Sequence, residues 1–214
     1  MDDLDDPPLV HDPPHVSAAL LVYAPLQVER LAVRRALPDA RVVSCGLGAA
    51  RARRAAAAAP PPAAVAVAGL CGAVDPGLRA GDVVVASEVR GPEGVVPCST
   101  AGLVAALAAL GVAPVHVGPI ASTRRVVYGP RRRALAAQGV LAADMESAWL
   151  AAAAGGAPFA VLRVVLDTPA REIYRPLATL SGAVRAWLAL RRAAPALASW
   201  AAGLPAPIVP LPPT

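Results

Sequence analysis

The sequence predicts one α/β domain in which helices cover both faces of a central sheet. Short apolar or β-branched runs alternate along the chain with segments of helical spacing. This alternation is typical of layered α/β folds. The length of 214 residues suits a single domain with a buried core.

The expected elements are bounded mostly by glycine and proline. We expect strands at 18–23, 40–44, 64–68, 82–89, 115–120 and 159–166. We expect helices at 28–37, between residue 48 and Pro60, and at 101–110, 143–154 and 177–200. Residues 1–17 are acidic and proline-rich and predict a disordered leader. The domain is expected over 18–202, followed by a proline-rich tail over 203–214.

The composition excludes several classes of function. The net charge is +5, but the arginines occur in twos and threes without interleaved aromatic residues. We therefore expect no binding to nucleic acid. Cys45, Cys71 and Cys98 match no metal-binding spacing, so we expect no metal site and a reduced, cytoplasmic setting.

A membrane span is not expected either. The apolar, charge-free run 55–74 is interrupted by three consecutive prolines and is interpreted as a helix followed by a strand. Trp187 and Trp200 lie on an arginine-containing helix, which leaves a membrane-surface role as an alternative. Core packing with one solvated face is the preferred interpretation of that helix.

Two short segments carry carboxylates where chemistry is expected. In Asp144-Met145-Glu146-Ser147 a glutamate opens an apolar helix, although a helix start capped by Asp144 is the preferred interpretation of this segment taken alone. In the segment 163–167 an apolar strand ends in Asp167. The carboxyl ends of strands line the ligand crevice in α/β folds, but such an aspartate can also cap a turn.

Two glycine-rich segments complete the pattern. Gly69 and Gly72 follow the strand 64–68, where glycine lets a backbone approach a flat ligand closely. Gly46 and Gly48 form a G-x-G turn before a helix, which is a weak signal alone.

Taken together, these segments resemble the purine nucleoside phosphorylase/nucleosidase superfamily, which includes the methylthioadenosine/adenosylhomocysteine nucleosidases. The resemblance extends from about residue 18 to about residue 200 and implies a phosphorylase/hydrolase-like three-layer fold with a mixed sheet. The residues at 144–147 and 167–171 are most similar to the corresponding segments of the hopanoid-associated phosphorylase branch. That branch is thought to release adenine from adenosylhopane.

The resemblance implies a role for each matching residue. Glu146 would bind the ribose hydroxyls and Met145 would pack on the sugar. Asp167 would protonate purine N7, and Glu29 would activate the attacking water, although a helix-start role explains Glu29 equally well. The base would lie on Gly69, Leu70, Cys71 and Gly72.

The identity of the nucleophile is open. Val67 and Leu70 occupy the positions where phosphorylases with a clear phosphate site carry arginine and serine. Phosphate held by Gly46, Gly48 and Arg51 is slightly favoured over water as the acceptor. We expect no cofactor beyond phosphate as a co-substrate, a small-molecule nucleoside as the partner, and a homodimer. A hydrolytic nucleosidase and a non-catalytic nucleoside-binding member are the alternatives.

Overall fold

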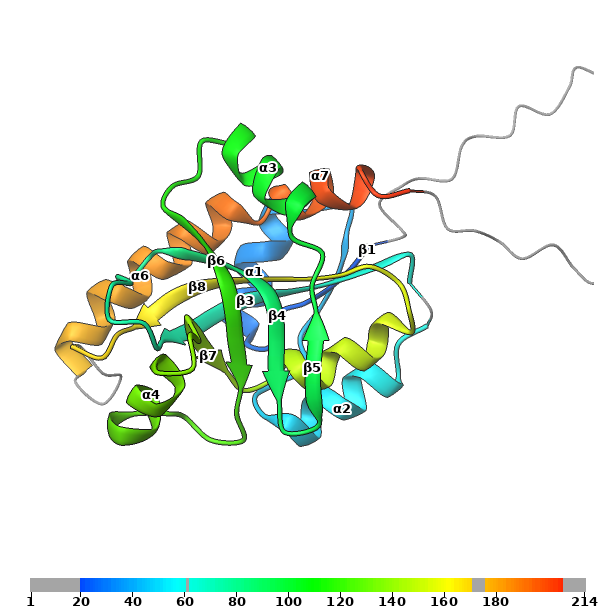
Figure 1. Cartoon of the computed structure of the whole chain (residues 1–214). Helices are drawn as coiled ribbons and strands as arrows, with labels where there is room; N and C mark the ends of the chain where they lie inside the picture. The colour runs from blue at the N-terminus through cyan, green and yellow to red at the C-terminus, as the bar shows by residue number, and fades with distance from the viewer. Residues whose placement is uncertain (1–19, 61, 171–175, 206–214) are drawn as a thin grey trace, which may run out of the picture.

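The computed structural model describes residues 20–60, 62–170 and 176–205. The expected leader 1–17 and most of the expected tail lie outside the described residues. The described part of the chain forms one layered α/β body (Figure 1).

The centre of the molecule is an eight-stranded mixed sheet, as expected. The strands run in the order β2-β1-β3-β7-β6-β4-β5, and β8 pairs with both β3 and β4. β3 is parallel to β1 and β8 but antiparallel to β7, while β4 is antiparallel to β5 and β8. The strands are β1 Leu20–Tyr23, β2 Arg41–Val43, β3 Ala64–Ala73, β4 Val83–Gly91, β5 Gly94–Pro97, β6 Val115–Ser122, β7 Ala142–Asp144 and β8 Phe159–Asp167.

Part of the sheet closes on itself. β8 joins β3 to β4, and β6 and β7 complete the circuit back to β3. In this arrangement Gly72 of β3 is in register with Asp167 on one side and with Ala143 on the other. The closure therefore brings the ends of β3, β7 and β8 to one place.

Helices cover both faces of the sheet (Figure 1). One face packs against α1, α3, α6 and α7, and the other against α2, α5 and the 3₁₀ helix η2. α4 lies beside β7, over a smaller apolar cluster. The helices are α1 Gln27–Ala36, α2 Ala49–Ala57, α3 Ala101–Ala109, α4 Gly129–Ala136, α5 Ser147–Leu150, η2 Ala151–Ala154, α6 Pro176–Ala193 and α7 Ala196–Ala202.

The two cores follow from the alternation of side chains along each strand. In β3, Ala64 and Ala66 face the α1/α6 cluster, whereas Val65 and Val67 face the α2/α5 cluster. A strand that buries both faces reads as an almost continuous apolar run. This is why 64–68 is apolar throughout and could be predicted as a strand.

Two expected helices differ from the structure. The closing helix predicted at 177–200 is two helices, because α6 ends at Ala193, α7 begins at Ala196 and Pro195 precedes the second one. Proline lacks the N–H that a continuous helix needs. The helix predicted at 143–154 begins only at Ser147, because residues 142–144 form β7.

The strand β3 is longer than predicted. It continues to Ala73, so Gly69 and Gly72 lie within the strand rather than in a turn after it. Pairing with β8 over 65–72 and with β7 at 72–73 keeps this glycine-containing stretch extended. β5, β7 and α4 were not expected from the sequence, because they are short and their residues show no clear periodicity.

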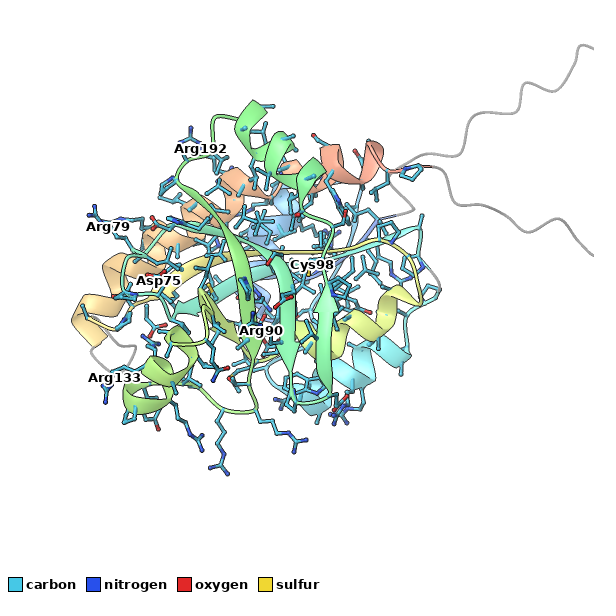
Figure 2. All side chains as sticks on the ribbon, in the orientation of Figure 1. Asp75, Arg79, Arg90, Cys98, Arg133 and Arg192 are labelled. Carbon is cyan, nitrogen blue, oxygen red and sulfur yellow. The ribbon has the colours of Figure 1, made fainter. Side chains whose placement is uncertain are left out.

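Arginines are distributed over the surface of the molecule. Arg79, Arg133 and Arg192 are exposed and lie at its periphery, far from one another (Figure 2). Among the described residues, no helix has both the length and the apolar character needed to cross a bilayer.

We expect Leu190→Ala to lower the free energy of unfolding by about 2–5 kcal/mol, because Leu190 of α6 is fully buried. Leu188→Ala on the same helix is the matched control, since Leu188 is 54% exposed and should change stability by less than about 0.5 kcal/mol. Urea denaturation of both variants measures the difference. Equal losses would show that α6 does not pack through the Leu190 side.

Candidate active site

A cavity of about 190 Å³ lies where β3, β7 and β8 end. Its charged lining residues are Glu29, Asp144, Glu146, Asp167 and Arg132. Of the residues predicted from the sequence to form the site, those that line this cavity are Glu29, Leu70, Cys71, Gly72, Met145, Glu146 and Asp167. The fold therefore brings together residues that are far apart in the sequence.

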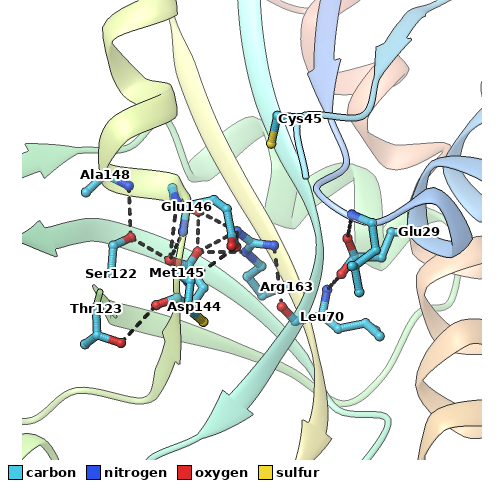
Figure 3. Close-up of polar contacts among 12 residues, drawn as sticks. Glu29, Cys45, Leu70, Ser122, Thr123, Asp144, Met145, Glu146, Ala148 and Arg163 are labelled. Atoms are coloured by element: carbon cyan, nitrogen blue, oxygen red, sulfur yellow. Dashed lines mark hydrogen bonds and ion pairs between the residues drawn. The ribbon is translucent and has the colours of Figure 1, made fainter. Parts of the chain in front are cut away.

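The buried guanidinium of Arg163 lies close to the carboxylates of Asp144 and Glu146 (Figure 3). Its Nε and Nη2 donate to Oδ2 of Asp144 at 2.9 and 2.6 Å. Nη2 is 3.8 Å from Oε2 of Glu146, and Nη1 donates weakly to the Leu70 carbonyl at 3.4 Å. Burial would lower the pKa of Arg163, but Asp144, Glu146 and Glu29 raise it, so the side chain stays charged.

Asp144 is the most completely bonded carboxylate of the group. Besides Arg163, it accepts hydrogen bonds from the hydroxyls of Ser122 and Ser147 and from the backbone N–H groups of Glu146 and Ser147. Burial would raise the pKa of Asp144, but Arg163 and the two hydroxyls outweigh burial and lower it. Asp144 is thus ionised and has a structural role. It accepts N–H groups at the start of α5, but the N-cap residue is Glu146, whereas the sequence had suggested Asp144.

Glu29 connects the start of α1 to β3. Its Oε2 accepts the N–H of Leu26 at 2.6 Å, and its Oε1 accepts the N–H of Leu70 at 2.7 Å. The first contact is the expected helix-start role, and the second places the carboxylate at the glycine-rich stretch. Burial raises the pKa of Glu29, although Arg163 and the two N–H donors oppose this.

Glu146 connects β7 to the turn before α2. Its Oε1 accepts the N–H of Gly48, 98 residues away in sequence, at 2.8 Å. Burial raises the pKa of Glu146 despite the opposing effect of Arg163. Glu146 also begins the short helix α5, so its structural and site roles coincide.

Two glycines of β3 provide space for charged side chains. A Cβ atom on Gly69 would lie 2.7 Å from Arg163 Nη1 and 2.8 Å from Glu29 Oε1. A Cβ atom on Gly72 would lie 2.9 Å from Asp167 Oδ1 and 3.0 Å from Arg132 Nη2. The two positions are three residue steps apart along the strand, which corresponds to about 10 Å. The cavity therefore has two charged ends, one formed by Glu29 close to Gly69, which does not itself line the cavity, and one formed by Asp167 and Arg132 at Gly72.

Asp167 and Arg132 form the charged pair at the Gly72 end. Nη2 of Arg132 lies 2.8 Å from Oδ2 of Asp167, and both side chains are at least nine-tenths buried. Asp167 ends β8 at the edge of the cavity, where the sequence predicted a site residue. Its arginine partner comes from α4, an element that the sequence did not reveal.

Four of the predicted site residues, Gly46, Gly48, Arg51 and Gly69, lie outside the residues that line the cavity. The N–H of Gly46 donates to the Pro25 carbonyl and that of Gly48 donates to Glu146. Nη1 of Arg51 donates to the Leu47 carbonyl at 3.2 Å. These donors, which the sequence suggested for phosphate, are engaged with the protein itself.

The cysteines are not arranged as nucleophiles. Burial raises the pKa of Cys45 to about 11 and also raises that of Cys71, so both are held as thiols. Within the described ranges, no group of three or more histidine, cysteine, aspartate or glutamate side chains is placed to hold a metal ion.

Sequence reasoning missed two contributors. Arg132 stands in the run Arg131-Arg132-Arg133, and nothing in the sequence separates it from its exposed neighbours. Arg163 was noticed only as part of a motif. A single charge inside the apolar run 159–166 is a usable signal, because a buried arginine requires carboxylate partners.

We expect Glu146→Gln to become more stable relative to wild type as the pH rises from 4.5 through the raised pKa of Glu146. The pKa of Glu146 is raised above 4.5 in the folded protein, because burial favours the protonated side chain. The stability that the wild type gains from this proton is fully present below pH 4.5 and is lost as the pH rises through the raised pKa. Glutamine has no such titration. Urea denaturation over this range measures the effect, with Glu88→Gln outside the cavity as the control. A pH-independent difference would contradict the expectation.

Comparison with known proteins supplies the family. The model of the phosphorylase superfamily matches residues 37–194. No curated protein sequence gives a significant match. The fold is similar to that of the 5′-methylthioadenosine/S-adenosylhomocysteine nucleosidase of Helicobacter pylori, at 18% identity over 86% of this chain and 98% of that chain, with a TM-score of 0.72.

Two further solved structures are similar. The corresponding nucleosidase of Colwellia psychrerythraea, in complex with adenine, has 19% identity, coverage of 85% and 94%, and a TM-score of 0.69. The futalosine hydrolase of Helicobacter pylori has 17% identity, coverage of 86% and 97%, and a TM-score of 0.69. These identities support a shared fold, and the family match covers most of the chain. The chain therefore belongs to the phosphorylase superfamily.

Proposed function

We propose that this protein cleaves the N-glycosidic bond of a purine nucleoside. One observation carries the proposal: Glu29, Glu146 and Asp167, which come from three distant parts of the chain, line one cavity. Structural neighbours include nucleosidases for methylthioadenosine and adenosylhomocysteine and a hydrolase for futalosine. A nucleoside has hydroxyls at one end and a base edge at the other, which suits a cavity with two charged ends.

The sugar is assigned to the end that contains Glu146 and Met145. A carboxylate accepts hydroxyl donors, and two neighbouring hydroxyls can share its two oxygens. The guanidinium of Arg163 lies 3.8 Å from the Glu146 carboxylate, and its positive charge offsets the negative charge buried at this end. Met145 lines the same cavity and offers an apolar surface to the sugar ring.

The base is assigned to the end that contains Asp167. As the bond between the sugar and N9 breaks, its electron pair moves onto the purine. A proton delivered to N7 neutralises the developing charge, and such general-acid help is worth about 10²–10⁴ in rate. Gly72 leaves room for the Asp167 carboxyl beside the strand.

Water is the proposed acceptor. The raised pKa of Glu29 suits a general base, which works best when its pKa approaches the working pH. The alternative, phosphate at the turn 46–48, has less support because the N–H groups of Gly46 and Gly48 are already engaged. Glu29 would take a proton from water while the water oxygen bonds to the anomeric carbon.

The finer identity of the substrate rests on sequence resemblance. That resemblance predicts an adenosyl substrate such as adenosylhopane, and a homodimer, and both stay predictions. Adenosine, inosine, methylthioadenosine and an adenosyl lipid form the substrate panel, with release of free base as the measurement. Absence of base release from every member would favour the non-catalytic alternative.

We expect Asp167→Asn to lower kcat by at least about tenfold, because an amide cannot deliver the proton that a carboxylic acid delivers. The matched control is Asp39→Asn, which changes an exposed aspartate outside the cavity. Steady-state rates and thermal melting are measured for both. Unchanged turnover in a folded Asp167→Asn protein would remove Asp167 from the mechanism.

We expect free ribose, rather than ribose 1-phosphate, as the sugar product, formed at the same rate with and without added phosphate. We also expect Glu29→Gln to lower this rate by at least about tenfold, because the amide is not a base. Glu88→Gln is the control. A product that is ribose 1-phosphate and requires added phosphate would show that phosphate is the acceptor.

A further inference from the structure

Arg132 has buried donors that the Asp167 contact does not use. Its side chain is 3% exposed, and only Nη2 is engaged with Asp167. Within the described ranges, Nε and Nη1 are buried and have no hydrogen-bond partner. A buried donor without an acceptor costs about 1–3 kcal/mol, so it calls for an explanation.

The surroundings of Arg132 indicate a ligand rather than a fold-stabilising role. Arg132 lines the same cavity as Asp167, together with the apolar residues Val127, Ala143 and Leu166. Donors at the edge of an apolar cavity are typical of sites that orient a flat, mostly apolar ligand. An acceptor atom of the ligand would satisfy the unused N–H groups.

The charge balance selects a neutral acceptor. Asp167 already neutralises Arg132 at 2.8 Å, so the pair together carries no net charge. A phosphate or carboxylate placed there would lie beside the Asp167 carboxylate, which carries charge of the same sign. A carbonyl oxygen accepts the N–H donors without that penalty.

We propose that Arg132 makes this site selective for nucleosides of 6-oxopurines over those of 6-aminopurines. The inference rests on the proposed function, which places the base at the Asp167 end. The edge of a 6-oxopurine that carries N7 also carries O6, so both of its groups are acceptors. The proposed function assigns N7 to Asp167, so the unused N–H groups of Arg132 remain to donate to O6, an acceptor that arginine also contacts in guanine.

The same edge of adenine presents a different pattern. N7 is an acceptor, but the 6-amino group is a donor. That amino group would face the unused N–H donors of Arg132 and leave them unsatisfied. The inference therefore opposes the adenine product that the sequence resemblance predicts.

Binding of free bases tests the inference without relying on turnover. Calorimetric titration of the wild-type full chain should show hypoxanthine binding at least about tenfold more tightly than adenine. Equal binding of the two bases, tighter binding of adenine, or no binding of either base would overturn the inference.

Three variants locate the preference at Arg132. Arg132→Met removes all its donors, and we expect the preference for hypoxanthine to disappear. Arg132→Lys keeps a positive charge for Asp167 but lacks the planar set of N–H donors, so the fold should be retained while the preference is lost. Arg133→Met is the matched control, because Arg133 is the exposed next residue of α4 (Figure 2).

The variants also separate recognition from a structural role. If Arg132 only holds Asp167, lysine will restore the preference, and that result would contradict the inference. Should Arg132→Met fail to fold in circular dichroism, the lysine variant alone decides the question. A loss of preference in Arg133→Met equal to that in Arg132→Lys would also contradict it.

Turnover separates this inference from the proposed function. We expect a higher kcat/KM for inosine than for adenosine. Faster cleavage of adenosine would overturn the base preference and leave glycosidic cleavage standing. A preference for hypoxanthine without cleavage of any nucleoside would support the recognition role and contradict the proposed enzyme.

Discussion

The buried ion pair between Arg163 and Asp144 is the interaction on which the rest of the site depends. Arg163 also lies near Glu146 and affects the pKa of Glu29, so one cation supports three carboxylates. Carboxylates buried without this charge would be strongly unfavourable. Because Asp144 also accepts N–H groups at the start of α5, the same pair sets the backbone path that presents Glu146.

The fold could be predicted where the pattern is strong and local. Alternation along the chain predicted a central sheet and most of its strands, because buried strands such as 64–68 are apolar throughout, whereas the mixed pairing was implied by the family resemblance. The helix at 143–154 was misplaced because a three-residue strand, β7, has too few residues to show a period. The break between α6 and α7 was predictable in principle, since Pro195 is visible in the sequence.

Part of the site could likewise be predicted from the sequence, and part could not. Glu146 and Asp167 could be named because each stands at the boundary of a predicted element, and Glu29 because of the family resemblance. The structure places all three on one cavity. The partner of Asp167 could not be named, because a contact over 35 residues depends on closure of the sheet and the position of α4. The fate of the Gly46 and Gly48 N–H groups likewise depends on tertiary contacts that sequence spacing does not contain.

The two glycines of β3 also constrain how this protein can evolve. Hydrophobic residues make up 56% of the chain, and alanine is the commonest small choice throughout. At positions 69 and 72 even a methyl group would meet charged atoms within 3 Å. Substitution by alanine would displace Arg163 and Glu29 at one position and Asp167 and Arg132 at the other. The cavity thus owes its two charged ends to the absence of two methyl groups.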